Sequence, residues 1–180
     1  MTGVEDFIGL SIREFSRLKK LADDAVAQIS EAQFFQAMGE GDNSVALIYK
    51  HMAGNMLSRW RDFLTTDGEK EWRNRDDEFQ IMDTDRYENL IVRWEESWSL
   101  LFSELEALEP ENLSRTITIR GEGLTVLQAM ARQLTHYAYH VGQIVFVSKS
   151  LAGSQWKSLS IPLGRSQTFN EAPSKYVEGK

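Results

Sequence analysis

The sequence predicts an all-α protein: a four-helix bundle with long crossover connections, a short β-hairpin or extended segment before the last helix, and a docked C-terminal tail. Three observations support this prediction. Apolar residues recur at helical spacing in four long stretches, capping residues precede these stretches, and a run of alternating residues precedes the last of them. A chain of 180 residues is long enough for one sizeable core, so we expect a single domain over residues 1–180.

Apolar stripes and capping residues predict the first two helices. The first is expected to begin at a capping box of Thr2 and Glu5. After a glycine-containing break, Asn43 or Ser44 can cap the second, which is expected to extend to about Leu64. Their inward residues are Phe7, Ile8, Ile12, Phe15, Leu18, Ala22, Ala25 and Ile29 in the first helix, and Val45, Ile48, His51, Met52, Asn55, Met56, Trp60 and Phe63 in the second.

A segment rich in charges of both signs separates these helices from the third. It extends from Thr65 to about Asp83, and Thr84 or Asp85 is expected to begin the third helix. Pro110 ends that helix or follows its end closely, because proline disrupts a helix interior. The inward residues of the third helix are Leu90, Ile91, Trp94, Trp98, Leu101, Phe102 and Leu105.

The last helix follows a segment of period two. Residues 116–119 alternate and stop at a glycine pair, which indicates a short β-hairpin or an extended crossover. Thr125 and Gln128 form a second capping box, and the helix is expected to end at about Ser150. Its inward residues are Val126, Leu127, Met130, Gln133, Tyr137, His140, Ile144 and Val147.

The residues after the last helix, about 151–180, are expected to form a tail that lies over the body. Trp156, Leu159 and Ile161 provide apolar side chains that can dock it. The connections on either side of the third helix are long, so the sequence does not require the simplest up-down-up-down topology.

Composition excludes several classes of function. A net charge of −7 argues against broad electrostatic binding to nucleic acid or anionic membranes. Because the chain has no cysteine, any reacting thiol must come from a small molecule. No stretch reaches the ~18 apolar residues of a membrane span, and the N-terminus has no basic region followed by a long apolar run. We expect a cytoplasmic protein that acts on a small-molecule substrate, without nucleic-acid or membrane partners.

All three histidines stand on inward helical faces. His136 and His140 are four residues apart, so a helix stacks them on one face, and His51 shares a face of the second helix with Ile48 and Asn55. Neutral imidazoles bind divalent transition metals, and three such ligands leave coordination positions open, as in catalytic sites. Histidines on apolar faces are also often hydrogen-bonded core residues, so the spacing alone leaves both interpretations open.

The sequence resembles the DinB-like (YfiT-like) metalloenzyme superfamily. The resemblance rests on the positions of the three histidines, on HMAGNMLSRWRDFLTTDGEKEWRNRDDEF (residues 51–79), on HYAYHVGQIVFVSKS (residues 136–150), and on the ending SLSIPLGRSQTFN. These blocks are closest to one uncharacterised domain family within that superfamily. The resemblance covers nearly the whole chain and implies a four-helix bundle in which His51, His136 and His140 bind a metal.

The resemblance also implies candidate activities. Characterised relatives include enzymes that join a low-molecular-weight thiol to an electrophile and mycothiol-dependent isomerases, and a founding member is induced by DNA damage. We therefore predict a metal-dependent enzyme, with a thiol S-transferase that activates a small-molecule thiol as the leading hypothesis. The alternatives are a metal-dependent hydrolase and a non-catalytic, stress-related metal-binding bundle. Zinc or nickel is the favoured metal, with iron or manganese as alternatives, and relatives commonly form homodimers.

Several polar residues could support the site. Asn55, Gln133 and Gln143 lie about one helical turn from a histidine and could orient a ligand imidazole or a substrate, or satisfy buried backbone groups instead. Arg59 leads a set of arginines that could bind carboxylates of a thiol cofactor, although a self-paired charged loop is the favoured interpretation of this segment. The set is Arg59, Arg61, Arg73 and Arg75. Asp76, Asp77 and Glu78 are weaker candidates for a general base.

Overall fold

Six α-helices and one two-stranded antiparallel sheet form the main regular structure of residues 3–171, the part of the chain that the computed structural model describes. The long helices are α1 (Gly3–Val26), α3 (Val45–Trp60), α4 (Tyr87–Glu106) and α5 (Val126–Ala152), and the short ones are α2 (Glu31–Phe35) and α6 (Ser166–Asn170). The strands are β1 (Thr116–Ile119) and β2 (Glu122–Thr125), and the 3-10 helices are η1 (Asp76–Phe79), η2 (Pro110–Ser114) and η3 (Gly153–Gln155). The predicted mostly helical fold is confirmed.

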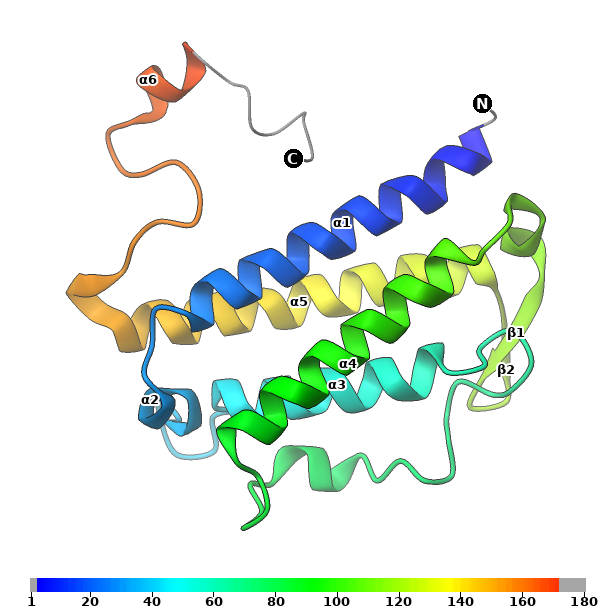
Figure 1. Ribbon diagram of the computed structural model, residues 1–180, viewed down its shortest axis with the longest axis horizontal. Coiled ribbons are helices and arrows are strands. Elements are labelled where there is room, and N and C mark those ends of the chain that lie inside the picture. Colours follow the sequence, from blue (N-terminus) through cyan, green and yellow to red (C-terminus); the bar gives the residue numbers. More distant parts are fainter. Residues whose placement is uncertain (1–2, 172–180) are drawn as a thin grey trace.

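The four long helices pack against one another. Helix α3 contacts α4 and α5, and α1 contacts α5 and α4. In Figure 1, α1 and α5 run in one direction, whereas α3 and α4 run in the other. The connection from α3 to α4, residues 61–86, must therefore return along the molecule, while α4 and α5 are joined at one end through η2 and the hairpin. Of the two long connections, only the first is a crossover.

The core is built around large aromatic side chains. Phe15 of α1, Trp98 of α4 and Tyr137 of α5 are fully buried. The Trp98 and Tyr137 ring centroids lie 5.9 Å apart, and Phe15 contacts both rings. Burial of this apolar surface is the main driving force for packing the helices together.

Capping explains where two of the long helices begin. Ser44 accepts a hydrogen bond from the backbone N–H of Leu47 and so caps α3. It is one of the two residues predicted to cap this helix. Thr125 and Gln128 form the predicted capping box of α5. The capping box expected at the start of α1 depends on Thr2, which lies outside the described residues.

The ends of α3 and α4 differ from the prediction by a few residues. Helix α3 stops at Trp60 rather than about Leu64, and Asp62 just beyond it has a φ of 51°, which a right-handed helix cannot accommodate. Helix α4 begins at Tyr87 rather than at residues 84–85. The Asp85 carboxylate instead accepts hydrogen bonds from the Met82 backbone N–H and the Lys50 ammonium, which holds residue 85 in the preceding turn.

The predicted β-hairpin is confirmed and is tied to the crossover segment. Arg120 and Gly121 both have positive φ, as tight hairpin turns require. The Asp67 carboxylate accepts hydrogen bonds from the backbone N–H groups of both turn residues and of Glu69. Burial alone raises the pKa of Asp67, but these hydrogen bonds outweigh it and lower the pKa to about 2.

Helix α2 was not predicted. Ser30 and Gln33 form a capping box at its start, and Phe34 is fully buried against the rings of Tyr49 and Tyr87. The helix is only five residues long. Its apolar pattern is therefore too short to show a helical period.

The prediction of a docked tail is partly correct for residues 151–171, and residues 172–180 lie outside the described residues. Trp156 and Leu159 pack against the core, and Lys157 exchanges two hydrogen bonds with Gln28. Residues 160–171 are mostly exposed, Leu163 fully so. Figure 1 shows α6 projecting away from the long helices.

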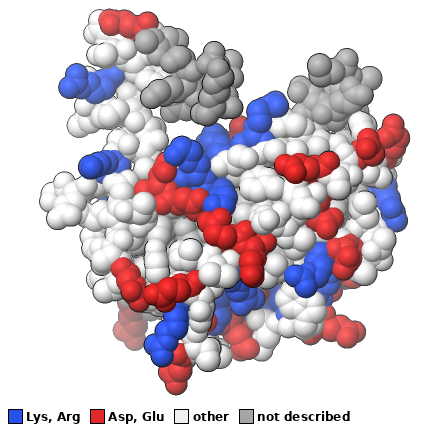
Figure 2. Space-filling view, viewed as in Figure 1, with Lys and Arg blue, Asp and Glu red and all other residues white. Residues whose placement is uncertain are grey.

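Surface charge and helix composition bear on the expected partners. Figure 2 shows basic side chains scattered among acidic ones on the viewed face, rather than gathered into one field. Within the described part of the chain, no helix combines the length and the apolarity needed to span a lipid bilayer.

Candidate metal centre

Three histidines from two neighbouring helices converge at one point. His51 comes from α3, and His136 and His140 come from adjacent turns of α5. One ring nitrogen from each can be chosen so that all three lie within 4.8 Å of one another. The Nε2 atoms of His136 and His140 are 3.1 Å apart, close to the ~3.3 Å between nitrogen ligands on a tetrahedral zinc ion. The donor set therefore fits a divalent transition metal.

Glu78 orients His51. The Nδ1 atom of His51 lies 2.9 Å from Oε2 of Glu78, and both side chains are buried. An ionised carboxylate only accepts hydrogen bonds, so Nδ1 carries the proton and Nε2 is left with a free lone pair. Carboxylates commonly hold metal-binding histidines in this way. The ring of His51 also packs against Phe79, with 4.8 Å between the centroids.

Gln143 orients the ring of His140 by accepting a hydrogen bond from it. Its Nε2 donates to the Tyr139 hydroxyl at 3.1 Å, which leaves Oε1 to accept a hydrogen bond from Nδ1 of His140 at 2.8 Å. The Nε2 lone pair of His140 then faces Nε2 of His136, 3.1 Å away. His51 and His140 thus both carry the proton on Nδ1 and keep the lone pair on Nε2.

Burial keeps two of the rings neutral. Burial, together with His140, His51 and two nearby arginines, lowers the pKa of His136 to about 3. Burial also lowers the pKa of His140 to about 4, with His51 adding to this and the hydrogen bond to Gln143 opposing it. Neutral imidazole is the form that binds a metal, so both rings are in the ligating form at physiological pH.

A buried ion pair holds Glu78 in place. Arg73 donates from Nε to Oε1 and from Nη2 to Oε2, each at 2.8 Å. Burial alone raises the pKa of Glu78, but Arg73 and His51 outweigh it and lower the pKa. The approach of Glu78 to α3 requires a glycine: a Cβ atom at Gly54 would lie 2.1 Å from Oε1 of Glu78.

The other predicted polar residues have different surroundings. Arg59 donates to the Gly68 carbonyl and, at 3.0 Å, to Glu69. These contacts favour the self-paired loop, as does the pairing of Arg73 with Glu78. The Oδ1 atom of Asn55 accepts a hydrogen bond from the Tyr137 hydroxyl at 3.1 Å. Gln133 is buried, and within the described residues its Oε1 has no hydrogen-bond partner.

Sequence reasoning missed the roles of Arg73 and Gly54 and underestimated Glu78. It treated Glu78 as one of three adjacent acidic residues, and no periodic pattern distinguishes it from them. A glycine in the middle of α3 was the available signal, because helix interiors disfavour glycine unless another group must approach closely.

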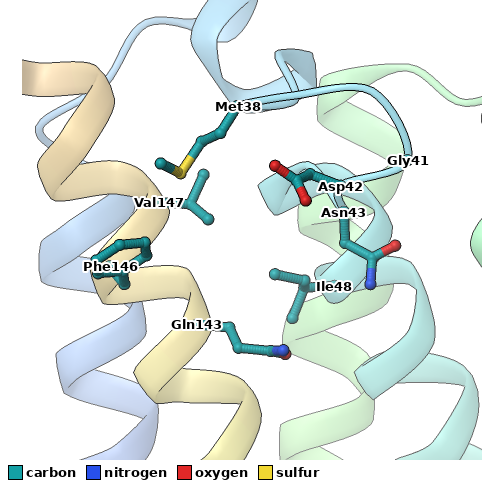
Figure 3. A pocket seen from close by; sticks show the side chains of 8 residues that line it. All are labelled: Met38, Gly41, Asp42, Asn43, Ile48, Gln143, Phe146 and Val147. Carbon is teal, nitrogen blue, oxygen red and sulfur yellow. The ribbon is translucent and has the colours of Figure 1, made fainter.

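A cavity lies beside the histidine cluster. It has a volume of about 300 Å³ and is lined by Met38, Gly41, Asp42, Asn43, Ile48, Gln143, Phe146 and Val147. Figure 3 shows Gln143 extending from α5 toward Ile48 of α3, below the connection between α2 and α3. Gln143 both lines the cavity and accepts the hydrogen bond from His140, so it links the two.

A protein-family comparison matches residues 3–165 to the family described as "Protein of unknown function (DUF1572)". The chain belongs to this family. The match confirms the expected membership of an uncharacterised domain family, and all three histidines of the DUF1572 chain lie inside the matched region. Searches of curated proteins and of solved structures found no match.

Proposed function

We propose that this protein is a metal-dependent enzyme of the DinB-like superfamily, and that it transfers a low-molecular-weight thiol to an electrophilic small molecule. The observation that carries the proposal is the convergence of the three histidines, with two Nε2 lone pairs oriented by Glu78 and Gln143. The donor set favours zinc or nickel, with iron or manganese as alternatives. A divalent metal held by three neutral imidazoles would act as a Lewis acid and lower the pKa of a coordinated thiol or water.

The surroundings of the histidines support a reacting site rather than a closed structural one. Structural zinc sites usually have four protein ligands. Among the described residues, the group of potential ligands contains three histidines and no fourth residue. The adjacent cavity provides space for a substrate beside His140.

The protein side chains contribute orientation and a dry environment. Glu78 and Gln143 fix the ring positions of His51 and His140, and Phe79 covers one face of His51. The chain has no cysteine, so the reacting thiol must be bound from solution.

The test combines metal analysis with a panel of substrates. Purified protein should contain near-stoichiometric metal, and metal-loaded protein should accelerate the reaction of glutathione-like, bacillithiol-like or mycothiol-like thiols with an electrophile. Chelation and His140→Ala should each abolish the acceleration. Cleavage of esters or amides without thiol transfer would establish a hydrolase instead, and bound metal with no turnover would establish a non-catalytic metal-binding protein.

On the same resemblance we propose that the protein acts in the cytoplasm as a homodimer. On helix α5, the well-exposed aromatic side chain of Tyr139 is suited to such a contact. Light scattering of the purified protein tests the dimer, and a monomer at micromolar concentration would refute it.

A further inference from the structure

The cavity beside the histidines has a buried apolar floor and an exposed mouth. Ile48 and Val147 form the floor and are 3% and 7% exposed. Met38 and Phe146 stand at the mouth and are 44% and 63% exposed. The cavity therefore offers apolar contact to a group that enters from solvent.

Two of the lining residues connect the cavity to the histidine cluster. Gln143 lines the cavity and accepts the hydrogen bond from His140. Ile48 is one helical turn before His51 on the same face of α3. A molecule in the cavity can therefore contact the same Gln143 side chain that accepts the hydrogen bond from His140. Figure 3 shows this side chain among the lining residues.

The described part of the cavity lining contains one charged side chain, and its charge is negative. Asp42 is the one charged side chain among the described residues that line it, and none of these is a lysine or arginine. In Figure 3 the Asp42 carboxylate points toward the space between Met38 and Asn43. No other described residue forms an ion pair with it, so its charge is not neutralised by the protein.

We propose that this cavity is a specificity pocket for an apolar substrate group that is uncharged or cationic. The inference rests on the proposed function, because the occupant is taken to be the substrate that reacts at the histidines. Anionic molecules are disfavoured by the Asp42 carboxylate. The apolar electrophile is therefore the reactant that occupies the pocket, and a thiol whose tail carries carboxylates is not.

Matched thiols bound to cobalt-loaded protein test the pocket without requiring turnover. The probes are 3-aminopropane-1-thiol, propane-1-thiol and 3-mercaptopropionate, which share three carbons and differ in the charge and polarity of the terminal group. Sulfur-to-cobalt absorption bands give the dissociation constant of each. The cationic and neutral probes should bind about threefold to tenfold more tightly than the anionic probe. Lengthening the neutral probe from propane-1-thiol to hexane-1-thiol should tighten binding further at each methylene.

Two variants and one control assign these preferences to the pocket. Asp42→Asn should remove most of the charge preference, and Phe146→Ala should weaken the dependence on chain length. Both positions are exposed, so the fold should be unaffected, which circular dichroism checks. Glu111→Gln removes the same charge from η2, which is near the start of α5 rather than the cavity, and should leave both preferences unchanged.

The outcomes separate the pocket from the metal site. If wild-type protein binds no cobalt, the proposed function fails and the pocket inference fails with it. If cobalt and thiols bind but tail charge and length have no effect, only the pocket inference is overturned. An equal loss of charge preference in Asp42→Asn and Glu111→Gln would also overturn it, because the preference would then come from overall charge.

Discussion

The carboxylate of Glu78 lies 2.9 Å from Nδ1 of His51, although 27 residues separate them in the chain. Both side chains are buried. The irregular crossover between α3 and α4 therefore places a residue against the candidate metal centre. Its path therefore affects the orientation of the His51 ring.

Substitution of Glu78 should weaken metal binding more than it disrupts the fold. Glu78→Asp keeps the negative charge that Arg73 requires but withdraws the carboxylate from His51. We expect metal affinity to fall about 10–100-fold, as is common when a residue that orients a metal-binding histidine is changed. Competition with a chelator measures the affinity, and circular dichroism verifies the helices.

The control for Glu78 is a nearby acidic residue without this contact. Asp76 is exposed and is in the same 3-10 helix, so Asp76→Asn should retain wild-type affinity. Equal affinities for wild type and Glu78→Asp would contradict the orienting role.

Two glycine substitutions should have opposite effects on stability. Gly54→Ala places a methyl group 2.1 Å from Oε1 of Glu78, and we expect destabilisation of about 1–3 kcal/mol from overpacking, together with weaker metal binding. Gly142→Ala meets no atom within 4 Å on α5 and should stabilise the helix by about 0.5–1 kcal/mol. Denaturant unfolding measures the stability of both variants. An unchanged free energy of unfolding for Gly54→Ala would show that Glu78 does not need the space left by the missing Cβ of Gly54.

His136→Ala should abolish tight metal binding and preserve most of the helical structure. The core depends on apolar residues of four helices, whereas His136 offers a potential ligand atom. Elemental analysis and circular dichroism provide the two readouts, with Thr135→Ala on the exposed side of α5 as the matched control. Full metal retention by His136→Ala would show that His136 is not a metal ligand.

The stability of metal-free protein should fall as the pH is lowered from 6.5 toward 4. Burial lowers the pKa of His136 to about 3 and of His140 to about 4, against an ordinary value of 6.5. In this window the unfolded chain binds protons that the folded chain does not, so acid favours unfolding. The upper limit is about 1.4 kcal/mol per pH unit for each ring.

Measurements between pH 6.5 and 5 isolate the histidines, because most carboxylates titrate at lower pH. The double variant His136→Ala/His140→Ala should show a flatter dependence of the free energy of unfolding on pH. An unchanged slope would mean that both rings protonate in the folded protein as readily as in the unfolded chain.

Local sequence patterns predicted much of the helical structure and half of the site. The starts of α3 and α5 follow from Ser44 and Thr125 because capping involves residues only three apart. The stacking of His136 and His140 follows from the helical period alone. Two of the four arginines, Arg59 and Arg73, pair with acidic residues of the charged segment, as expected where charges of both signs are close together.

The sequence by itself determined which residues could ligate a metal and which helical faces carry them. Tertiary structure alone decided that His51 of α3 packs beside His136 and His140 of α5. It also decided that Glu78 rather than Asp76 contacts His51, and that the tail leaves the helical body after Leu159. The position of Glu78 depends on the crossover, which has no hydrophobic period. Its path is set by non-local contacts, such as Asp67 with the hairpin turn at Arg120. Contacts between residues so far apart leave no repeating pattern in a single sequence.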